Sequence, residues 1–542
     1  MSDSAASTDQ RHAGANSTAT TAGSNADNTK TKDRTSQARK DYMKRLRGLF
    51  IGIVLAVLVY AFFPDNGADL VNAAYPDDES GPFTIEAMRL TAAVAVLMGA
   101  WWMTEAIPLA ATALVPLVVF PLSQVVSFGD ISPSYADPTI FLFMGGFILA
   151  LGMQKWNLHR RLALSVVLLV GTKPKQLILG FMIATGFLSM WVSNTATAVV
   201  MLPIGMSVLG LTSEIVGGMK KQKKFATALM LAIAYSASIG SLGTIIGTPP
   251  NTLMAAYMSS SQGIEIGFFD WMMVGVPLAV VFMVIAWLVL ITVFKPEMKE
   301  IPGGKQLIQK ELRDMGSMSR AEKTAGVIFV AAALSWVFIP LVTDWFGWGI
   351  TIADAAIGMT AGLLMFIIPV DEKGTRVIAW EDAQEMPWDV LLLFGGGLAL
   401  SSMFGNSGLS LWIGEQSKAM EALPLVVLVA AVAALVLVLT EFTSNTATAA
   451  TFLPIMGGVA VGIGLTAEQD MNVMLLVIPV ALAATCAFML PVATPPNAIA
   501  YSSGYVRIGD MVKGGLWLNV IAVFLITIVV FLLAVPVFGL VL

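Results

Sequence analysis

The sequence predicts an all-α polytopic membrane protein built as an inverted repeat of two halves. Two observations of composition indicate a membrane protein: 56% of the 542 residues are apolar, and only 12% are charged. The repeat is indicated by motifs that recur in the two halves. Soluble domains carry about 25% charged residues, so a surface in contact with water on every side is excluded. The chain also has 48 glycines and 25 prolines, which indicate broken or closely packed helices around a cavity and favour a protein that handles a solute.

Residue types that serve disulfide and much catalytic chemistry are scarce. The chain has one cysteine, Cys486, and two histidines, His12 and His159. One cysteine excludes a disulfide framework and a cysteine-based metal site, and two histidines leave little for histidine-dependent catalysis. We expect no enzyme, no organic cofactor and no nucleic-acid partner, and we expect Cys486 to be a small packing residue.

Residues 1–47 are rich in Ser, Thr, Ala, Asn and Asp and show no apolar period, which predicts a disordered cytoplasmic tail. The tail ends in Lys44, Arg45 and Arg47, and an apolar run follows at 49–63. A signal peptide could have this pattern, but the tail is long and no small-residue cleavage site follows. The run is therefore predicted to be a first transmembrane helix that starts in the cytoplasm.

Further apolar segments follow the first. A single crossing needs about 20 residues, and most of the segments fit one crossing. Four of them do not resolve so simply, and each contains one short polar interruption: 177–211, 225–260, 423–465 and 472–502. The others lie near 86–104, 107–125, 138–153, 271–294, 324–343, 348–370, 388–405 and 514–541.

Basic residues mark one side of the membrane. The loops at 64–84, 126–137, 261–270 and 466–471 hold acids and no Lys or Arg. If all the basic loops are cytoplasmic, two of the interrupted segments leave and return on the same side, one from each face of the membrane. This predicts about 11 crossings, a cytoplasmic N-terminus and an external C-terminus. The basic clusters lie at 44–47, 155–175, 220–224, 295–323, 373–376 and 507–513.

The two same-side segments, 177–211 and 423–465, could each be two tilted helices or one re-entrant hairpin. The flanks of the interruption in the first are only about 16 and 14 residues, short of the roughly 20 that a crossing needs. We therefore favour two re-entrant hairpins. A pair of tilted helices joined by a tight polar loop stays the alternative.

The two halves of the chain carry the same motifs in the same order. Ser-Asn-Thr-Ala-Thr-Ala at 193–198 recurs at 444–449, and Thr-Pro-Pro-Asn at 248–251 recurs at 494–497. The charge pattern opens the two hairpins to opposite faces, so the repeat is inverted. Inverted repeats with paired interrupted segments are typical of a secondary transporter whose site lies near the midplane.

The motifs place uncharged polar groups at bilayer depth. Ser-Asn-Thr offers two hydroxyls and an amide, which must bind something because unsatisfied polar groups are costly there. Two successive prolines cannot lie inside a regular helix, so Thr-Pro-Pro-Asn exposes carbonyls before the break and amides after it. Carbonyls and hydroxyls suit a small cation, and the amide-rich start of a helix suits an anion. For an isolated motif, hydrogen bonding between helices is the alternative.

No Lys or Arg lies in or beside the four motifs. A multiply charged anion would then need co-bound cations and helix dipoles to balance its charge, which predicts coupled transport. Glu441 precedes the second Ser-Asn-Thr, where the first repeat has Met190, and it could be a proton-coupling carboxylate or a buried structural acid. His159, Arg160 and Arg161 are expected in an amphipathic segment at the cytoplasmic surface.

The paired Ser-Asn-Thr motifs and Pro-Pro-Asn breaks resemble those of the divalent anion:sodium symporter family, from about residue 85 to the C-terminus. The resemblance implies a dimeric elevator transporter that carries C4-type dicarboxylates with sodium. It implies a scaffold at 48–153 and 324–405, which would form the dimer interface, and a transport domain at 176–294 and 423–542. The remaining parts are a cytoplasmic connector at 154–175, a cytoplasmic loop at 295–323 and an external connector at 406–422.

The resemblance also assigns site residues one by one. The substrate carboxylates would meet residues of both hairpins and both breaks: Asn194, Thr195, Thr248, Pro249, Asn445, Thr446, Thr494 and Pro495. A first sodium site would use Ser189, Ser193, Asn194 and the carbonyl of Gly247. A second would use Thr440, Thr443, Asn445 and the carbonyl of Ala493, with Thr443 standing where a small apolar residue is expected.

Residues and resemblance together favour a sodium-coupled importer of succinate, fumarate or malate in the plasma (inner) membrane. A dicarboxylate exchanger, or a citrate or sulfate transporter of the same fold, is the alternative. An ion channel is disfavoured because channels usually repeat in parallel around an axis. An intramembrane enzyme is disfavoured because no paired aspartates, Ser-His pair or metal-ligand cluster is expected at depth.

Overall fold

The computed structural model describes residues 42–76, 81–171, 173–298, 300–301, 303–346, 352–466 and 470–542. This part of the chain is helical, apart from one isolated bridge between Pro369 and Arg376. The predicted disordered tail lies outside the described residues up to residue 41, and its last part already belongs to the helix Tyr42–Phe62. The prediction of an all-α protein is confirmed for the described residues.

The first half runs from outer helices into a hairpin and a broken helix. The outer helices and the connector are α2 (Gly67–Ala74), α3 (Ile85–Thr104), α4 (Leu109–Thr112), α5 (Val115–Leu122), α6 (Phe128–Ile131), η1 (Ser132–Ala136), α7 (Pro138–Lys155) and α8 (Leu158–Val170). Then come α9 (Pro174–Ser189), α10 (Asn194–Val216), η2 (Met219–Gln222), α11 (Lys223–Ser241), η3 (Ile245–Gly247), α12 (Pro249–Gln262), α13 (Phe268–Val293) and, in the following loop, α14 (Gly304–Asp314).

The second half repeats this order. Its outer helices and connector are α15 (Arg320–Phe346), α16 (Asp354–Ile367), α17 (Trp380–Ala383), α18 (Trp388–Asn406), α19 (Leu409–Ser417) and η4 (Lys418–Ala422). Its hairpin and broken helix are α20 (Leu425–Thr440), α21 (Asn445–Gly462), η5 (Asp470–Val473), α22 (Met474–Thr485), α23 (Pro495–Ser502), α24 (Ile508–Val529), the π-helical η6 (Val530–Ala534) and α25 (Val535–Phe538).

Each predicted polar interruption coincides with a gap between two α-helices. Helices α9 and α20 have 16 residues each. At about 1.5 Å per residue they are shorter than the roughly 30 Å of hydrocarbon that a crossing helix spans, which fits re-entrant hairpins. Helix α10 has 23 residues and is long and apolar enough to cross a membrane, so the predicted flank of about 14 residues is wrong, because the helix ends at the left-handed Gly217 rather than where the apolar run ends. The choice between a re-entrant hairpin and two tilted helices stays a prediction.

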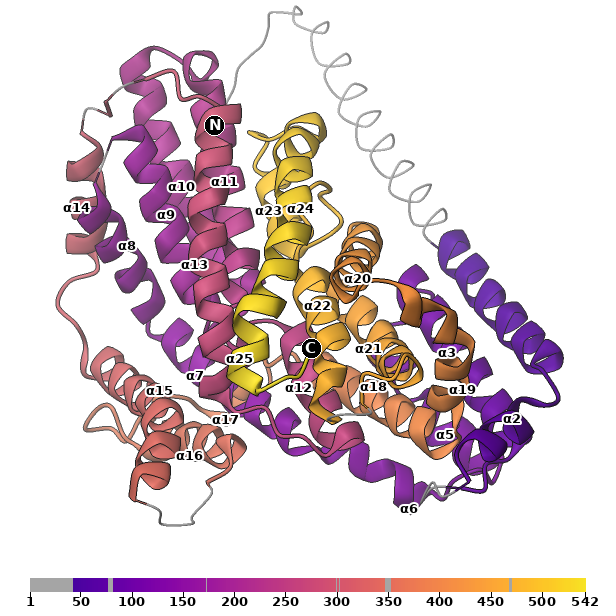
Figure 1. Cartoon of the computed structure of the whole chain (residues 1–542). Coiled ribbons are helices and arrows are strands. Elements are labelled where there is room, and N and C mark those ends of the chain that lie inside the picture. Colours follow the sequence, from indigo (N-terminus) through magenta and orange to yellow (C-terminus); the bar gives the residue numbers. More distant parts are fainter. Residues whose placement is uncertain are drawn as a thin grey trace, which may run out of the picture.

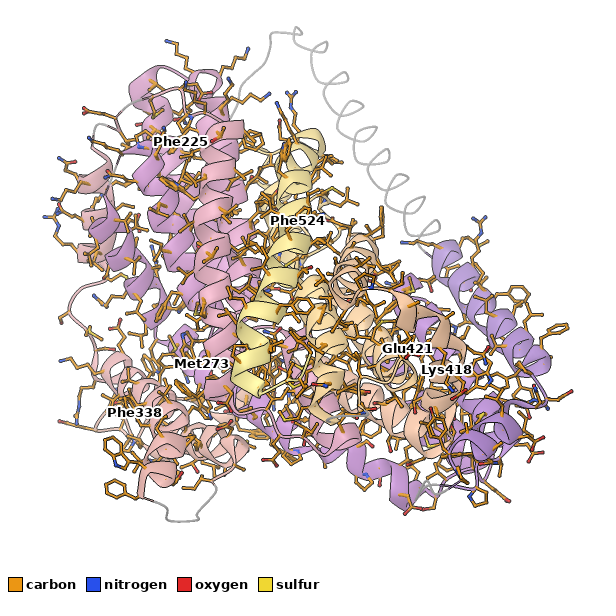
Figure 2. All side chains as sticks on the ribbon, in the orientation of Figure 1. Phe225, Met273, Phe338, Lys418, Glu421 and Phe524 are labelled. Atoms are coloured by element: carbon orange, nitrogen blue, oxygen red, sulfur yellow. The ribbon has the colours of Figure 1, made fainter. Side chains whose placement is uncertain are left out.

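Within the described residues, nine helices are long and apolar enough to cross a membrane, and four shorter apolar helices accompany them. Large apolar side chains cover the outward faces, such as Phe338 on α15 and Phe524 on α24 (Figure 2). Such faces suit a lipid environment, so the chain is a multi-pass membrane protein. The predicted number of 11 crossings stays a prediction.

Helices α11 and α22 are buried along almost their whole length. Helix α11 packs against α9, α10 and α13, and α22 packs against α20, α21 and α24 (Figure 1). The two halves also contact each other: α12 of the first half packs against α21 and α22, and α23 of the second half packs against α10 and α11. Each broken helix therefore lies beside the hairpin of the other half.

Glycines let the remaining helices approach closely. A side chain at Gly145 on α7 would overlap the backbone of Gly358 on α16, and one at Gly396 on α18 would overlap Ala113. Helices α7 and α18 also contact α12. The high glycine content thus serves close helix packing at these positions.

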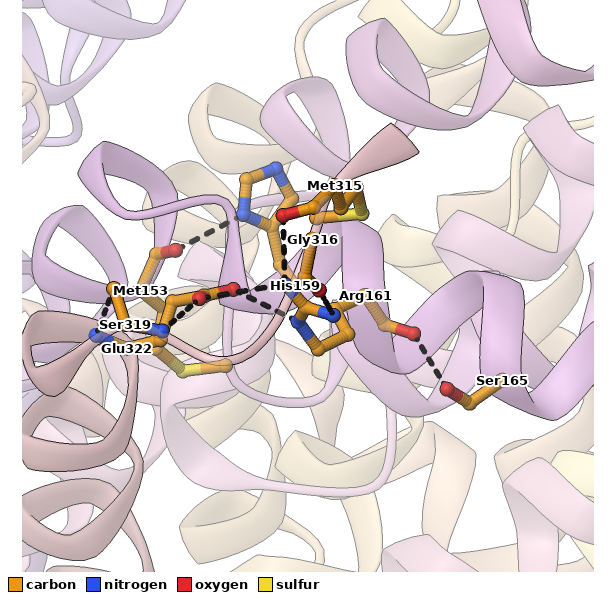
Figure 3. A network of polar contacts seen from close by, with 8 residues as sticks. All are labelled: Met153, His159, Arg161, Ser165, Met315, Gly316, Ser319 and Glu322. Atoms are coloured by element: carbon orange, nitrogen blue, oxygen red, sulfur yellow. Dashed lines mark hydrogen bonds and ion pairs between the residues drawn. The ribbon is translucent and has the colours of Figure 1, made fainter. Parts of the chain in front are cut away.

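A polar network joins the connector α8 to the loop before α15 (Figure 3). The Arg161 guanidinium binds the Glu322 carboxylate at 2.9 Å and donates to the carbonyls of Met315 and Gly316. His159 Nδ1 lies 3.1 Å from the Met153 carbonyl oxygen. Burial lowers the pKa of the His159 imidazole, which is 4% exposed. His159 and Arg161 thus lie on the inner face of this segment, whose position at the cytoplasmic surface stays a prediction.

Candidate functional site

At both hairpin tips a short helix ends and another begins. Ser193 caps α10, because its hydroxyl oxygen accepts a hydrogen bond from the Ala196 amide at 3.2 Å. Ser444 holds the same position before α21. Asn194 and Asn445 are therefore the first residues of these helices, and both are half-buried.

The first tip brings three oxygens together. The Ser189 hydroxyl lies 2.7 Å from the carbonyl oxygen of Ala237 on α11 and 2.9 Å from Asn194 Oδ1. A hydroxyl has one proton to donate, so one of these two close oxygen contacts lacks a proton. Oxygens that are close together and short of protons suit a small, hard cation.

The second tip repeats this arrangement. The Thr440 hydroxyl lies 2.7 Å from the carbonyl oxygen of Ala484 on α22 and 2.8 Å from Asn445 Oδ1. The carbonyls of Ala237 and Ala484 were missing from the predicted ligands, because each lies more than 40 residues from its tip along the chain and no motif marks it.

Prolines interrupt the helix at each break, and an asparagine holds the open segment of the same break. Two prolines occupy the first positions of α12 and of α23, where a helix needs no amide donor. Asn251 Nδ2 donates to the Thr244 carbonyl at 2.9 Å. Asn497 Nδ2 donates to the carbonyls of Ala487 and Leu490 at 3.0 and 3.1 Å. The last residue of each Thr-Pro-Pro-Asn motif thus fixes the open segment before it, a role that sequence reasoning missed.

The two breaks also meet each other. The hydroxyl oxygens of Thr248 and Thr485, one from each half, lie 3.5 Å apart. Helix α12 packs against hairpin helix α21, and α23 packs against hairpin helix α10. The structure therefore brings the four predicted motifs into one region between the halves.

The residues predicted to bind substrate differ in access. Thr248 and Thr494 are buried, and the Thr494 hydroxyl caps α23 by accepting from the Asn497 amide at 3.2 Å. Thr195 and Pro495 are exposed. The remaining four are half-buried: Asn194, Pro249, Asn445 and Thr446.

The predicted sodium ligands fall into two groups. Gly247 and Ala493 are buried and directly precede the threonines of the breaks, and their part in sodium binding stays a prediction. The Thr443 hydroxyl, by contrast, is engaged with the Leu439 carbonyl at 2.9 Å and with the Thr448 hydroxyl at 2.6 Å. A contribution from Thr443 would therefore come from its backbone carbonyl.

Helix ends supply the electrostatics of this region. Helices α10, α12, α21 and α23 begin there, and each helix start carries a partial positive charge that favours an anion. Helices α9, α11, α20 and α22 end there, and their terminal carbonyls favour a cation. The described residues contain no group of three or more His, Cys, Asp or Glu side chains that could hold a metal. The arrangement is thus suited to an anion and to cations bound by neutral oxygens.

One charged side chain stands next to the second tip. Glu441 is 1% exposed, and its carboxylate accepts hydrogen bonds from the amides of Phe488, Met489 and Leu490. Asn519 Nδ2 on α24 donates to the same carboxylate at 2.7 Å. Sequence reasoning singled out Glu441 but not its donors.

The chain matches a family model described as the sodium:sulfate symporter transmembrane region over residues 83–540. The chain belongs to the divalent anion:sodium symporter family. It is 42% identical over 502 residues to the sodium-dependent dicarboxylate transporter SdcS of Staphylococcus saprophyticus, covering 91% of this chain and 92% of that protein. It is 41% identical over 496 residues to SdcS of Staphylococcus aureus strain USA300, covering 90% of each. The predicted family is confirmed.

A solved structure resembles the fold. The YdaH transporter of Alcanivorax borkumensis superposes with a TM-score of 0.52 at 14% identity, over 82% of this chain and 98% of that one. At this identity the likeness bears on the fold alone. This family member is accordingly a transporter by its relatives and a helical membrane protein by its structure.

Proposed function

We propose that the protein is a secondary active symporter that carries C4-dicarboxylates such as succinate, fumarate and malate into the cell together with sodium. The supporting observation is the pair of oxygen clusters at the hairpin tips, each beside helix starts that favour an anion. The relatives named sodium-dependent dicarboxylate transporter agree with this proposal.

In this proposal each tip holds one sodium ion. The first ion lies among Ser189, Ser193, Asn194 and the carbonyls of Gly247 and Ala237. The second lies among Thr440, Asn445, the backbone of Thr443 and the carbonyls of Ala493 and Ala484. The dicarboxylate bridges the two Ser-Asn-Thr motifs and the starts of α12 and α23. Because the site has no fixed cationic side chain, the sodium ions supply the charge that the dianion needs.

The packing of the two second half-helices supports an elevator motion. Helix α12 packs on the scaffold helices α7 and α18, whereas α23 has its main contacts within the transport domain. At the same end as α12, the Phe268 amide donates to Asp354 on α16 at 2.7 Å. By the charge pattern this is the external end, so we propose that the structure has its site open toward the cytoplasm. The opposite state would exchange the roles of α12 and α23.

We further propose a homodimer in the plasma (inner) membrane, with a cytoplasmic N-terminus and an external C-terminus. The apolar scaffold helices would supply the interface between the two copies. These assignments rest on the family and on the charge of the loops.

Reconstituted uptake tests the function. Purified protein in proteoliposomes is given succinate, malate, citrate, glutamate or sulfate, with an inward gradient of sodium or of potassium. We expect succinate and malate uptake that needs sodium. Equal succinate uptake in potassium would contradict the proposal, and sodium-independent counterflow of two dicarboxylates would select the exchanger. Sulfate belongs in the panel because the matching family model names it.

Cross-linking tests the elevator motion. Cysteines in place of Phe268 and Asp354 would tie the transport domain to the scaffold, and we expect their oxidation to stop uptake until a reductant is added. A pair in place of Thr227 and Tyr505, which meet inside the transport domain, is the matched control. Uptake that survives the first cross-link would contradict the motion.

A further inference from the structure

The two broken helices are held open by different means. In the second half, three successive backbone amides leave the helix after α22 and point at one carboxylate. The amides of Phe488 and Met489 donate to Glu441 Oε1 at 2.7 and 2.9 Å, and the Leu490 amide donates to Oε2 at 3.1 Å. Asn519 Nδ2 adds a fourth hydrogen bond at 2.7 Å. The open segment of this break is therefore wrapped around the Glu441 carboxylate.

The first half has no such carboxylate. Met190 stands in the position of Glu441, and its side chain packs against Gly243 in the open segment. The Leu242 and Gly243 amides donate to the carbonyls of Ile239 and Gly240 at 3.3 and 3.0 Å, so the end of α11 continues as a tight helical turn. Ala279 stands in the position of Asn519 when Gly275 and Gly515, which both touch a carbonyl of their break, are aligned. The first break is thus held by neutral groups: its own backbone turn, the Thr244 hydroxyl, which donates to the Met190 carbonyl, and Asn251.

The chemistry of the four donors defines the role of the carboxylate. All four contacts come from N–H groups, and an ionised carboxylate is a pure acceptor that can take them all. Hydrogen bonds from backbone amides to a charged oxygen are shorter and stronger than neutral ones, so this segment is firmly positioned. Because Glu441 follows Thr440 directly, the same residue links the hairpin tip to the open segment.

We infer that Glu441 is the positioning residue of the second sodium site, and that its charge makes this site the tighter of the two. The inference rests on the proposed sodium coupling. The Ala484 carbonyl that meets the Thr440 hydroxyl lies just before the segment that Glu441 holds, and the predicted Ala493 carbonyl lies just after it. A negative charge one residue from Thr440 also attracts a cation in the low dielectric of the membrane interior. The first site has the same tip but lacks the charge.

The substitution Glu441→Gln tests this role with nearly the same shape. A glutamine has only one acceptor oxygen and places an NH2 group against the amides, so the open segment loses its fixed position. We expect the sodium concentration for half-maximal succinate uptake to rise about tenfold, equivalent to about 1.4 kcal/mol. The maximal rate at saturating sodium should stay within about twofold, because the substrate-binding groups are intact.

A second readout avoids transport altogether. Sodium stabilises a purified protein that binds it only when folded, and the sodium concentration needed reports the affinity. Thermal unfolding in detergent is followed against sodium chloride, with choline chloride holding the ionic strength constant. We expect Glu441→Gln to need about tenfold more sodium for the same rise in melting temperature.

Two further variants keep the inference testable if Glu441→Gln folds poorly. Asn519→Ala leaves the carboxylate and removes one donor, and we expect a rise in the sodium requirement in the same direction but of only about two- to threefold. Met190→Leu, at the matched position of the first half, should leave the sodium requirement unchanged. A wild-type sodium requirement in both Glu441→Gln and Asn519→Ala would overturn the inference, and so would a change confined to the succinate concentration.

The outcomes separate this inference from the proposed function. A wild-type protein without sodium-dependent uptake or stabilisation would overturn the proposed function and this inference together. Sodium dependence in the wild type that is unaltered in both Glu441→Gln and Asn519→Ala would overturn the inference alone.

Discussion

The two hairpin tips of this transporter are nearly alike, whereas the two helix breaks beside them are not. Each tip joins a hydroxyl, an asparagine oxygen and a carbonyl of the neighbouring broken helix at 2.7–2.9 Å. Both breaks are tied by an asparagine, but the first adds only neutral contacts, whereas the second adds the Glu441 carboxylate. If the two halves form the inverted repeat that we propose, they must offer the solute similar groups from both sides, but each support has only to fit its own surroundings.

The largest effect should come from the asparagines of the two tips. Asn194→Ala or Asn445→Ala removes an oxygen that we assign to both sodium and substrate. Because each variant weakens the binding of two charged solutes at once, we expect uptake to fall by roughly a hundredfold or more, while protein still reaches the membrane. Uptake in proteoliposomes and protein content by immunoblot measure the two quantities. Wild-type uptake in both variants would break the assignment of the tips.

The next effect should come from Gly275 and Gly515, where both breaks share one feature. A methyl group at either would overlap a carbonyl of the open segment, that of Leu242 or of Phe488. Overpacking costs about 1–3 kcal/mol, so we expect Gly275→Ala and Gly515→Ala to lower uptake by roughly tenfold or more. Gly509→Ala is the matched control, because that position on α24 faces open space. An unaffected Gly515→Ala would show that α24 does not support the break.

An intermediate effect is expected where the asparagines tie the breaks. Asn251→Ala and Asn497→Ala each remove hydrogen bonds to buried carbonyls of the open segment, which costs about 1–3 kcal/mol. We expect uptake to fall by about tenfold in either variant, and the melting temperature to fall as well. If uptake fell much more in one variant than in the other, the two breaks would also differ in how much they depend on their asparagines.

The smallest effect should come from giving the second tip the residue type of the first. Thr440→Ser gives the second tip the hydroxyl that Ser189 provides in the first, and we expect the sodium requirement to change by less than about twofold. Thr440→Ala removes the hydroxyl and should raise that requirement about tenfold. Titration of uptake against sodium distinguishes the two. A large change in the sodium requirement of Thr440→Ser would mean that the two tips bind sodium differently in spite of their similar geometry.

Much of this arrangement could be predicted because prolines and polar residues are conspicuous in apolar helices. The positions of both tips and both breaks follow from Ser-Asn-Thr and Pro-Pro-Asn alone. Helix lengths were harder, since hydropathy marks where an apolar run ends while α10 ends at Gly217. The contact between His159 and the Met153 carbonyl was not predicted, because hydropathy cannot reveal a backbone partner.

The contacts that complete the site could not be predicted from the sequence. Ala237, Ala484 and the donors to Glu441 act through backbone groups, which every residue has and no motif marks. Their roles come from the way α11, α22 and α24 pack against the tips. Asn519 was missed because it stands alone on an apolar helix, 78 residues from its partner.

We propose that the anion is bound without a fixed positive charge, so sodium must be bound with it. Succinate binding to the purified protein, measured by calorimetry at increasing sodium with choline in balance, tests this most directly. Linkage requires each solute to strengthen the binding of the other by the same factor. We predict no measurable succinate binding in choline and a succinate affinity that rises steeply with sodium. Equal succinate affinity in choline and in sodium would contradict the account.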